Sequence, residues 1–261
     1  MCLPETNNPI AVSVADVKAE PMDVGRALIE DLVVANHILF DQGIVDAFGH
    51  VSVRHNERPD HFLLARNMAP GSVTAADIVM FTVDGNPINA NGRKVYLERF
   101  IHGEIYRAFP DVMAVVHSHS PAIVPLSVVK GVPLRAMFHM AGFIGQGAPV
   151  FEIRDTGGSA TDLLVSSNAL GVALAGCFET SDIVLMRGHG STVIGRTLHQ
   201  AVYRAVYAEL NARFQTTAIQ MGEVTYLTDE ESKACLESIE GQVHRPWDLW
   251  KRQAEAKRMK V

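Results

Sequence analysis

The sequence predicts an α/β fold in a single domain. Amphipathic segments with helical spacing alternate with short runs that are either apolar at every second residue or continuously apolar, as expected for strands. The chain has 261 residues, of which 48% are hydrophobic, so it can bury a core and is not a disordered chain. It contains no internal repeat and no low-complexity linker that would divide it.

The first half of the chain is predicted to hold two helices with three strands between them. Apolar residues recur at helical spacing over 24–42 and again over 96–109, where Pro110 ends the pattern. Three short apolar segments separated by polar turns are the predicted strands: 50–54, 61–65 and 78–83.

The second half contains two continuously apolar runs, which are typical of strands buried on both faces. They are VMAVVH over 112–117 and DIVLMR over 182–187, and the second is expected to continue over 191–194 after a turn. The other predicted elements are helices within 121–128, 158–176, 197–220 and 229–240 and a strand at 148–153.

The expected organisation is one folded unit with a segment on either side. Residues 1–23, which are interrupted by prolines and charges, are expected to form an N-terminal tail, and the main domain to cover 24–240. Residues 241–261 are expected to form a C-terminal tail with aromatic and charged residues. Trp247 and Trp250 are predicted to anchor this tail on the domain, and the alternative is that they close over the functional site.

The charge balance excludes several classes of protein. The chain has 23 Lys and Arg against 29 Asp and Glu, a net charge of −6, whereas general nucleic-acid binders rely on basic residues. No basic start precedes an apolar run, as in a secretory signal, and no apolar stretch is long enough to span a bilayer. We therefore expect a cytoplasmic protein that has neither nucleic acid nor membrane as its partner.

Histidine is far more frequent than cysteine in this chain, with 11 His against 3 Cys. Cys2, Cys177 and Cys235 are too widely spaced for a disulfide framework or a C-x-x-C site, and we expect free thiols. If the protein binds a metal ion, imidazole nitrogen rather than sulfur is expected to hold it.

Three histidines follow the two apolar runs. His117 and His119 are two residues apart at the end of a strand, so both side chains project to one face and can reach one ion. His189 lies between Gly188 and Gly190 after the second run. Three protein ligands with an open position are typical of a catalytic zinc site. The alternatives are polar residues at a strand edge and an exposed His in a glycine-rich turn.

Glu98 lies in the first turn of the helix predicted over 96–109, where the helix dipole favours a carboxylate. It is a candidate catalytic acid or base, and the alternative is an ordinary helix-start Glu.

Taken in order, these motifs resemble the class II aldolase/adducin family. Glu98 is followed by P-D-V-M-A-V-V-H-S-H-S-P, which contains His117 and His119, and then by R-G-H-G around His189; the similarity extends over about residues 24–222. The resemblance implies a single α/β/α domain with a mostly antiparallel central sheet. It also implies that the three histidines are metal ligands, that Glu98 is the acid/base residue beside the metal, and that the protein is a homotetramer with sites near subunit interfaces.

Three segments that bind phosphate in the sugar-phosphate aldolases of this family differ here. The S-G-N-x-S pattern is replaced by F-G-H-V-S over 48–52, and the serine pair before the Glu by Tyr96 and Leu97. The Thr-Gly-rich loop is replaced by L-A-R-N-M over 64–68. Because phosphate sites need many hydroxyl and backbone donors, these changes argue against a phosphorylated sugar.

The replacements combine cations with aromatic surface, which suits a planar aromatic carboxylate better than a polyol phosphate. The cations are His50, Arg54 and Arg66. The apolar or aromatic partners are Phe48, Met68, Tyr96 and Phe138. The alternative for either arginine is a solvated residue of a strand.

The motifs G-H-x-S-x-R, Y-L-E-R-F, H-S-H-S-P and R-G-H-G together resemble a decarboxylase branch of the family. The 3-hydroxy-2-methylpyridine-4,5-dicarboxylate and dihydroxyphthalate decarboxylases belong to that branch. The resemblance adds Ser52 of the first motif to the substrate-binding residues. It also implies that His139 lines the site from the same or a neighbouring subunit, and the alternative for His139 is a core histidine.

We therefore predict a metal-dependent carbon–carbon lyase, with decarboxylation of a hydroxylated aromatic or pyridine (di)carboxylate as the reaction. Decarboxylation and retro-aldol cleavage both leave negative charge on carbon, which a divalent ion next to a substrate oxygen stabilises. Arg54 or Arg66 is expected to hold a second carboxylate of the small anionic substrate. Glu98, with its pKa raised by burial, is expected to protonate the carbon after CO₂ leaves.

Other functions fit the same motifs. They are a retro-aldolase or epimerase acting on a hydroxy-carbonyl compound or a sugar phosphate, a non-catalytic interaction module like that of adducin, and a non-haem iron oxygenase. Three imidazoles suit Zn²⁺, but Mn²⁺, Fe²⁺ and Co²⁺ occupy similar sites.

Overall fold

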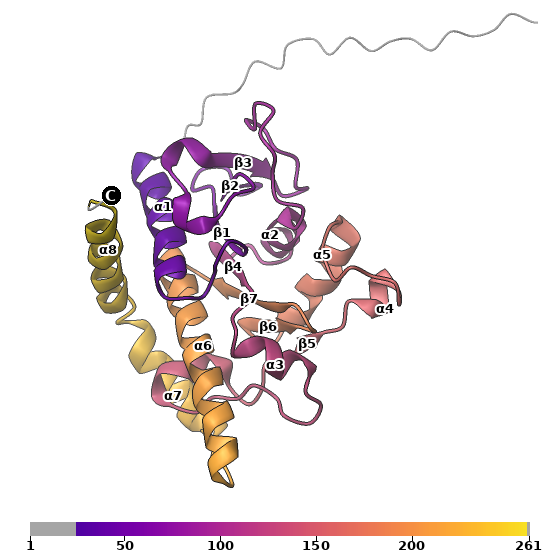
Figure 1. Cartoon of the computed structure of the whole chain (residues 1–261), viewed down its shortest axis with the longest axis vertical. Coiled ribbons are helices and arrows are strands. Elements are labelled where there is room, and N and C mark those ends of the chain that lie inside the picture. The colour runs from indigo at the N-terminus through magenta and orange to yellow at the C-terminus, as the bar shows by residue number, and fades with distance from the viewer. Residues whose placement is uncertain (1–24, 260–261) are drawn as a thin grey trace, which may run out of the picture.

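A seven-stranded sheet runs through the molecule, with helices against both faces (Figure 1). The computed structural model describes residues 25–259, so the predicted tail over 1–23 lies outside the described residues. The strand order is β3 (Ile78–Thr82), β2 (His61–Ala65), β1 (His50–Arg54), β4 (Ala114–Ser118), β7 (Gly190–Gly195), β6 (Ile183–Met186) and β5 (Val150–Phe151). Neighbouring strands are antiparallel except for the parallel pair β5 and β6. This mixed α/β sheet, antiparallel in all but one pair, confirms the predicted fold class.

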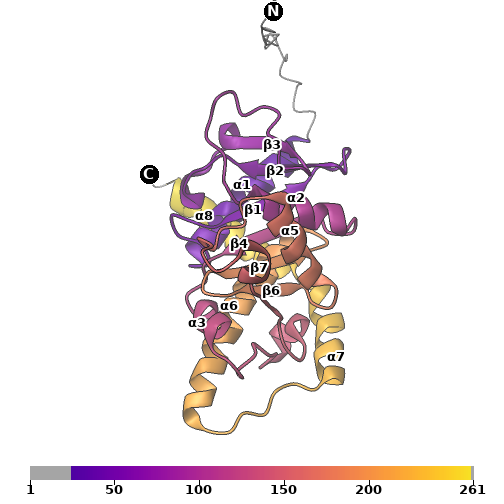
Figure 2. The same ribbon diagram turned by 90° about the vertical axis from the view of Figure 1, so that its right-hand side faces the viewer.

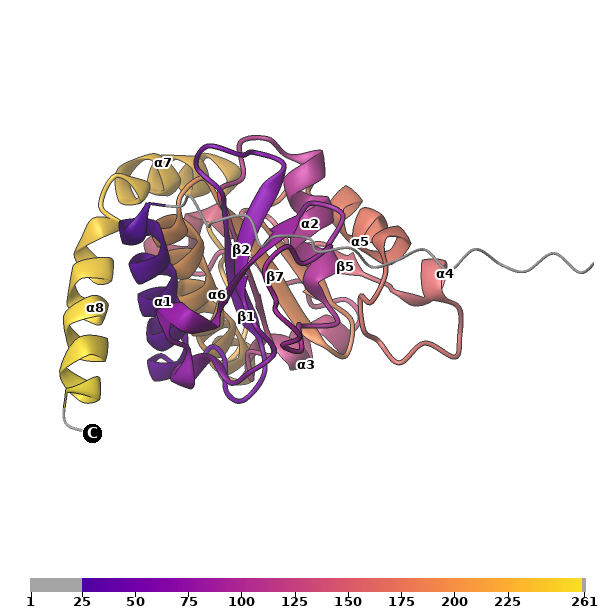
Figure 3. The same cartoon turned by 90° about the horizontal axis from the view of Figure 1, so that it is seen from above.

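The helices form one layer on each side of the sheet (Figure 3). One layer contains α1 (Arg26–Asp41), α6 (Leu198–Met221) and α8 (His244–Arg258), and the other contains α2 (Arg99–Ala108) and α5 (Asn168–Ala175). Because both faces are covered, β4 and β6 are buried at every residue, which explains their continuously apolar sequences.

Smaller elements connect these layers. The long helix α6 continues beyond the sheet, and the chain then returns to α7 (Asp229–Glu240) (Figure 2). The remaining elements are α3 (Ile123–Val128), α4 (Arg154–Gly157), η1 (Pro70–Ser72), η2 (Ala75–Asp77), η3 (His139–Ile144) and η4 (Gly176–Phe178). Within residues 25–259, no helix combines the length and the apolar character needed to cross a membrane.

The register of the central strands places polar side chains in one row. His50 of β1 is paired with His117 of β4, and His117 is paired with Thr192 of β7. Directly paired residues of antiparallel strands project to the same face. Hydrogen bonds between Ser52 and two residues of α2 show that this is the face covered by α2.

The segment predicted as a C-terminal tail is instead a 15-residue helix, α8, that packs on the domain. Trp247 and Trp250 are buried, and the Trp247 ring stacks on His199 of α6 with a centroid distance of 4.0 Å. Lys251 forms an ion pair with Asp31 of α1. The expected anchoring by the two tryptophans is confirmed, and the folded unit continues to Arg258 rather than ending near residue 240.

Candidate metal centre

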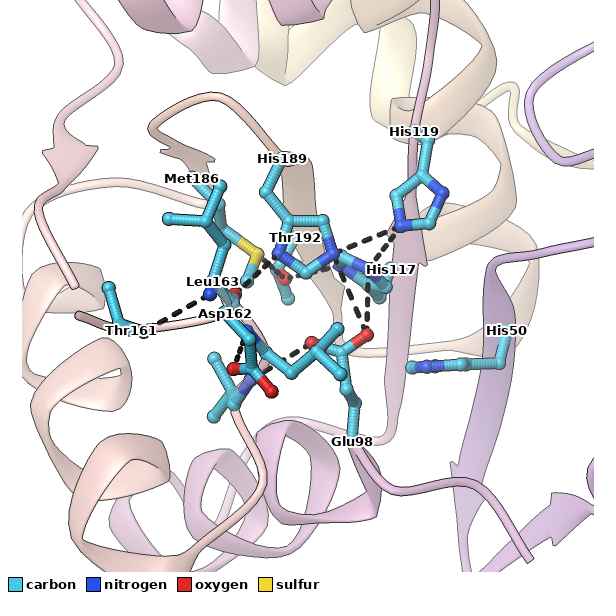
Figure 4. A network of polar contacts seen from close by, with 12 residues as sticks. His50, Glu98, His117, His119, Thr161, Asp162, Leu163, Met186, His189 and Thr192 are labelled. Carbon is cyan, nitrogen blue, oxygen red and sulfur yellow. Dashed lines mark hydrogen bonds and ion pairs between the residues drawn. The ribbon is translucent and has the colours of Figure 1, made fainter. Parts of the chain in front are cut away.

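The structure brings together four side chains from three distant parts of the sequence (Figure 4). They are Glu98, His117, His119 and His189, and the atoms that each would offer to a metal ion all lie within 4.8 Å of one another. These are the four residues that the sequence predicts as metal ligands and acid/base residue.

Strand ends and one tight turn position the three imidazoles. His117 is in β4, and His119 follows just after the strand, so the extended backbone directs both rings to one side. His189 lies in the turn between β6 and β7, where Gly188 has a φ of +65°. A Cβ atom on Gly190 would lie 2.0 Å from the Ser118 carbonyl oxygen, so only glycine lets this turn approach β4 so closely.

Hydrogen bonds fix which ring nitrogens face the centre. His189 donates from Nδ1 to the Leu163 carbonyl at 2.9 Å. The Thr192 hydroxyl donates to Met186 Sδ and lies 3.4 Å from His117 Nδ1, from which it can accept. The Nε2 atoms of His117 and His189 therefore turn their lone pairs inward, as in metal sites where a second hydrogen bond orients the ligand.

The three inward nitrogens fit a bound cation. Nε2 of His119 lies 3.2 Å from Nε2 of His117 and 3.0 Å from Nε2 of His189. Two nitrogens bound tetrahedrally to Zn²⁺ at about 2.0–2.1 Å lie about 3.3 Å apart. Burial lowers the pKa of His117 and of His119, which favours the neutral imidazole that a metal ion requires.

Glu98 completes the cluster from the helical layer. It is the residue just before α2, and its carboxylate Oε1 accepts a hydrogen bond from the Val165 amide at 3.0 Å. Oε2 lies 3.6 Å from Nε2 of both His117 and His189. Burial raises the pKa of Glu98, although His189 and the Val165 amide act in the opposite direction. A buried carboxyl with a raised pKa suits a group that takes up and delivers a proton.

A cavity of about 260 Å³ opens beside the cluster. His50 and Tyr96 form part of its wall, with their ring centroids 4.7 Å apart, and the His50 ring lies 5.0 Å from that of His117. Tyr96 donates its hydroxyl hydrogen to the Met68 carbonyl, and burial raises the pKa of Tyr96 to about 12. The rest of the lining is mostly apolar: Ala47, Phe48, Gly49, Asn67, Met68, Ala69, Leu97, Glu98, His119 and Leu164.

The prediction that Arg54 binds substrate is wrong. Its guanidinium is buried and donates to four backbone carbonyls, those of Pro59, Tyr106, Phe109 and Val112. Arg54 is also at the far end of β1 from His50. These bonds hold the end of α2 and the following loop against the sheet, and Arg54 does not line the cavity, so its guanidinium is not placed to bind a substrate carboxylate.

Ser52 also serves the interior rather than the cavity. It is completely buried, and its hydroxyl contacts His102 Nδ1 at 2.6 Å and the Tyr106 hydroxyl at 2.7 Å. Its predicted contact with substrate is therefore corrected to a contact with α2.

Arg66 and His139 do not line the cavity of their own chain. Arg66 donates from Nε to Asp77 at 2.7 Å. His139 is exposed and borders a separate cavity of about 510 Å³, with Tyr203, Tyr207 and Trp250 among its neighbours. Both residues were predicted to contact substrate, and the structure of one chain does not place them there.

Several residues that orient the cluster carry no motif in the sequence. Leu163 and Val165 contribute backbone atoms from the loop before α5, and Leu163 has an uncommon positive φ of +70°. Thr192 contributes a hydroxyl, which its strand register places beside His117. Backbone contacts leave no residue-type signal, and strand register is not readable from one sequence.

Comparisons with known proteins identify the family of this chain. Residues 30–216 match the profile of the family described as Class II Aldolase and Adducin N-terminal domain. The chain is 37% identical over 242 residues to decarboxylase tropJ of Talaromyces stipitatus, covering 84% of this chain and 91% of that protein. It is 29% identical over 191 residues to 3,4-dihydroxyphthalate decarboxylase of Arthrobacter keyseri, covering 68% and 73%.

The fold is shared with a solved aldolase. L-fuculose 1-phosphate aldolase from Glaciozyma antarctica superposes with a TM-score of 0.72 over 90% of both chains, at 22% identity. At that identity the likeness concerns the fold alone. The profile match spans most of the domain, and the chain therefore belongs to the class II aldolase and adducin N-terminal domain family.

Proposed function

We propose that this protein is a divalent-metal-dependent decarboxylase of a hydroxylated aromatic or pyridine carboxylate. The observation that carries the proposal is the lining of the cavity beside the His and Glu cluster, which is mostly aromatic and aliphatic and, among the described residues, includes no serine, threonine, lysine or arginine. Its similarity to two proteins named as decarboxylases, and its family membership, support an enzyme of the lyase class.

In this proposal His117, His119 and His189 hold the metal ion, which is Zn²⁺ or one of Mn²⁺, Fe²⁺ and Co²⁺. A divalent ion there supplies a positive charge that stabilises the electron pair left when the carbon–carbon bond breaks.

The side chains around the cluster orient the substrate and supply the proton. The Val165 amide holds Oε1 of Glu98, so that the other carboxyl oxygen faces the cavity and can protonate the carbon after CO₂ has left. Tyr96 and Leu97 offer flat and apolar surfaces for a ring, and His50 offers a ring nitrogen to a substrate oxygen.

The cavity narrows the substrate class. No lysine or arginine among residues 25–259 lines it, because Arg54 and Arg66 are engaged elsewhere. The substrate that fits one chain therefore has a single carboxylate next to a hydroxyl or keto oxygen, and both groups lie near the metal ion. A second carboxylate would need a cation from a neighbouring subunit.

We further propose a cytoplasmic homotetramer that binds a small anionic substrate and neither nucleic acid nor a membrane. Phe48 and Leu97 at the cavity are 66% and 60% exposed, which favours a neighbouring subunit that covers them. Light scattering on the eluting protein would report the assembly, and a monomer would contradict this part of the proposal.

The test is metal analysis followed by an assay for CO₂ release. The purified protein is expected to contain close to one divalent ion per chain and to release CO₂ from members of a panel of hydroxybenzoates and hydroxypyridine carboxylates. Cleavage of a sugar phosphate that inorganic phosphate inhibits would instead identify a retro-aldolase, and substrate-dependent oxygen uptake an iron oxygenase. Metal-free protein without activity would indicate an interaction module.

A further inference from the structure

A chain of buried polar side chains leads from α2 to the cavity wall. His50 Nδ1 lies 2.7 Å from His102 Nε2, and His102 Nδ1 lies 2.6 Å from Ser52 Oγ. Ser52 Oγ lies 2.7 Å from the Tyr106 hydroxyl. All four residues are at most 3% exposed, and of the four it is His50 that lines the cavity.

The direction of donation follows from the hydrogens that these groups carry. Burial lowers the pKa of His102 to about 3, so its ring is neutral and has one N–H. Tyr106 donates to Ser52, and the Ser52 hydroxyl then donates to the bare Nδ1 of His102. His102 therefore carries its hydrogen on Nε2 and donates to His50 Nδ1. Every hydrogen between Tyr106 and His50 then has an acceptor, and the one hydrogen left over, on Nε2 of His50, belongs to the residue that lines the cavity.

The opposite direction leaves one hydrogen without an acceptor. If His50 donated to His102, then His102 would donate to Ser52, and Ser52 to Tyr106. The Tyr106 hydroxyl would then need an acceptor other than Ser52. Its further hydrogen bond is with the backbone of Val115, and it acts to lower the pKa of Tyr106, as an N–H that donates to the phenol oxygen does and a carbonyl acceptor does not. A buried donor without an acceptor is costly, so the first direction is favoured.

We propose that Tyr106, Ser52 and His102 are positioning residues. They hold His50 in the tautomer with its hydrogen on Nε2, so that His50 donates a hydrogen bond to an oxygen of the bound substrate. Nε2 is on the side of the ring away from Nδ1, and no hydrogen bond within the described part of the chain uses it. His50 is also not among the residues of the metal cluster, where a bare nitrogen would be needed.

The consequence is selectivity for a substrate oxygen at this point of the cavity. A fixed N–H donor favours a carboxylate, phenolate or carbonyl oxygen and disfavours a substrate group that can only donate. The identity of that acceptor rests on the proposed function, whereas the tautomer of His50 does not.

The tautomer can be measured directly by NMR. Full-length protein labelled with ¹⁵N-histidine and loaded with Zn²⁺ would give long-range ¹H–¹⁵N correlations, and His50→Gln would assign the His50 signals. We expect a protonated Nε2 and a bare Nδ1 in the wild type. A protonated Nδ1 with a bare Nε2 would overturn the proposal.

Two substitutions of His102 separate positioning from packing. In His102→Gln the side-chain amide still donates to His50, so the His50 tautomer and the binding of 2-hydroxybenzoate, measured by calorimetry, are expected to stay within about twofold of the wild type. In His102→Leu the donor is lost, and we expect mixed tautomers and about tenfold weaker binding with unchanged zinc content. Tyr106→Phe, which removes the first donor, is expected to mix the tautomers as well.

If His102→Leu kept the His50 tautomer and the affinity for 2-hydroxybenzoate of the wild type, the proposed positioning role of Tyr106, Ser52 and His102 would be contradicted. If the protein bound no hydroxyaromatic acid and released no CO₂, the proposed function would fail. The NMR measurement would still decide whether Tyr106, Ser52 and His102 fix the tautomer of His50.

Discussion

At the scale of single residues, hydrogen bonds from atoms outside the His and Glu cluster orient the side chains within it. His189 and Glu98 are both held by backbone atoms of the loop before α5, through the Leu163 carbonyl and the Val165 amide. The loop thus fixes one imidazole of the cluster and the candidate proton donor together. A shift of this loop would disturb both, although neither of its two anchoring residues carries a reactive side chain.

His119→Ala should remove metal and activity together. Without one of three imidazoles, the remaining pair is expected to bind the divalent ion about a hundredfold more weakly or worse. Elemental analysis after dialysis and the CO₂ assay would measure both effects. His244→Ala, at an exposed position at the start of α8, is the matched control and should change neither; retained metal in His119→Ala would refute its role as a ligand.

Glu98→Gln should separate metal binding from turnover. The amide oxygen of Gln can still accept from the Val165 N–H, so the fold and the metal content are expected to remain. The lost proton donor should lower kcat by about 10²–10⁴-fold. Full activity in this variant would remove Glu98 from the mechanism.

At the scale of elements, β1 shows how one strand serves two purposes. His50 lies at the end that reaches the cavity, whereas Arg54 lies at the other end and binds the carbonyls around the end of α2. Both residues project to the same face, so the alternation of the strand could not distinguish them. Their roles differ because His50 is at the end of β1 next to the cavity, whereas Arg54 is at the end next to the last turn of α2.

Arg54→Met should therefore act on stability rather than on substrate binding. The substitution leaves four carbonyls, of which those of Tyr106 and Val112 belong to buried residues, without their charged donor, and we expect the free energy of unfolding to fall by about 3 kcal/mol. Urea unfolding would measure the loss, and KM of the folded enzyme should stay the same. Arg26→Met, at a side chain that is 93% exposed, is the control. A large rise in KM with unchanged stability would restore the substrate role.

At the scale of the whole molecule, α8 ties the C-terminal part of the chain to its first described helix. The ion pair between Lys251 and Asp31, and the hydrogen bond from Arg258 to Asp41, join residues more than 200 positions apart. The buried faces of Trp247 and Trp250 belong to the same core as α1. The outer helical layer is thus completed from both ends of the described chain.

Trp247→Ala should destabilise the fold without emptying the metal centre. Large-to-small changes of buried aromatic residues typically cost about 3–5 kcal/mol, and we expect a fall of that size in the free energy of unfolding. Zinc content and KM should remain. Leu249→Ala, at a residue of the same helix that is 47% exposed, is expected to have a much smaller effect. An equally stable Trp247→Ala protein with a raised KM would instead support a cover over the site.

The predictable parts of this protein are those with a local signature. The continuous runs before His117 and His189 identify buried strands, and the H-x-H and G-H-G patterns mark their ends. Arg54, Arg66 and Ser52 were less predictable, because a polar residue in a strand can face substrate, a carboxylate or a neighbouring helix. Each of the three meets a partner within the chain: the partner of Arg66 is 11 residues away in the sequence, and those of Ser52 and Arg54 include residues 50 and 58 positions away.

The sequence by itself determined the fold class and the family, and it predicted the four residues that the structure brings together, Glu98, His117, His119 and His189. It could do so because periodicity and short motifs are properties of neighbouring residues. Only the tertiary structure decided that Arg54 donates hydrogen bonds to carbonyls around the end of α2, that His50 is hydrogen-bonded to His102, and that the segment after residue 240 is a packed helix. Those outcomes depend on which elements are brought into contact. A buried donor or charge is stable only where the fold provides its acceptor, and that pairing is set by three-dimensional packing.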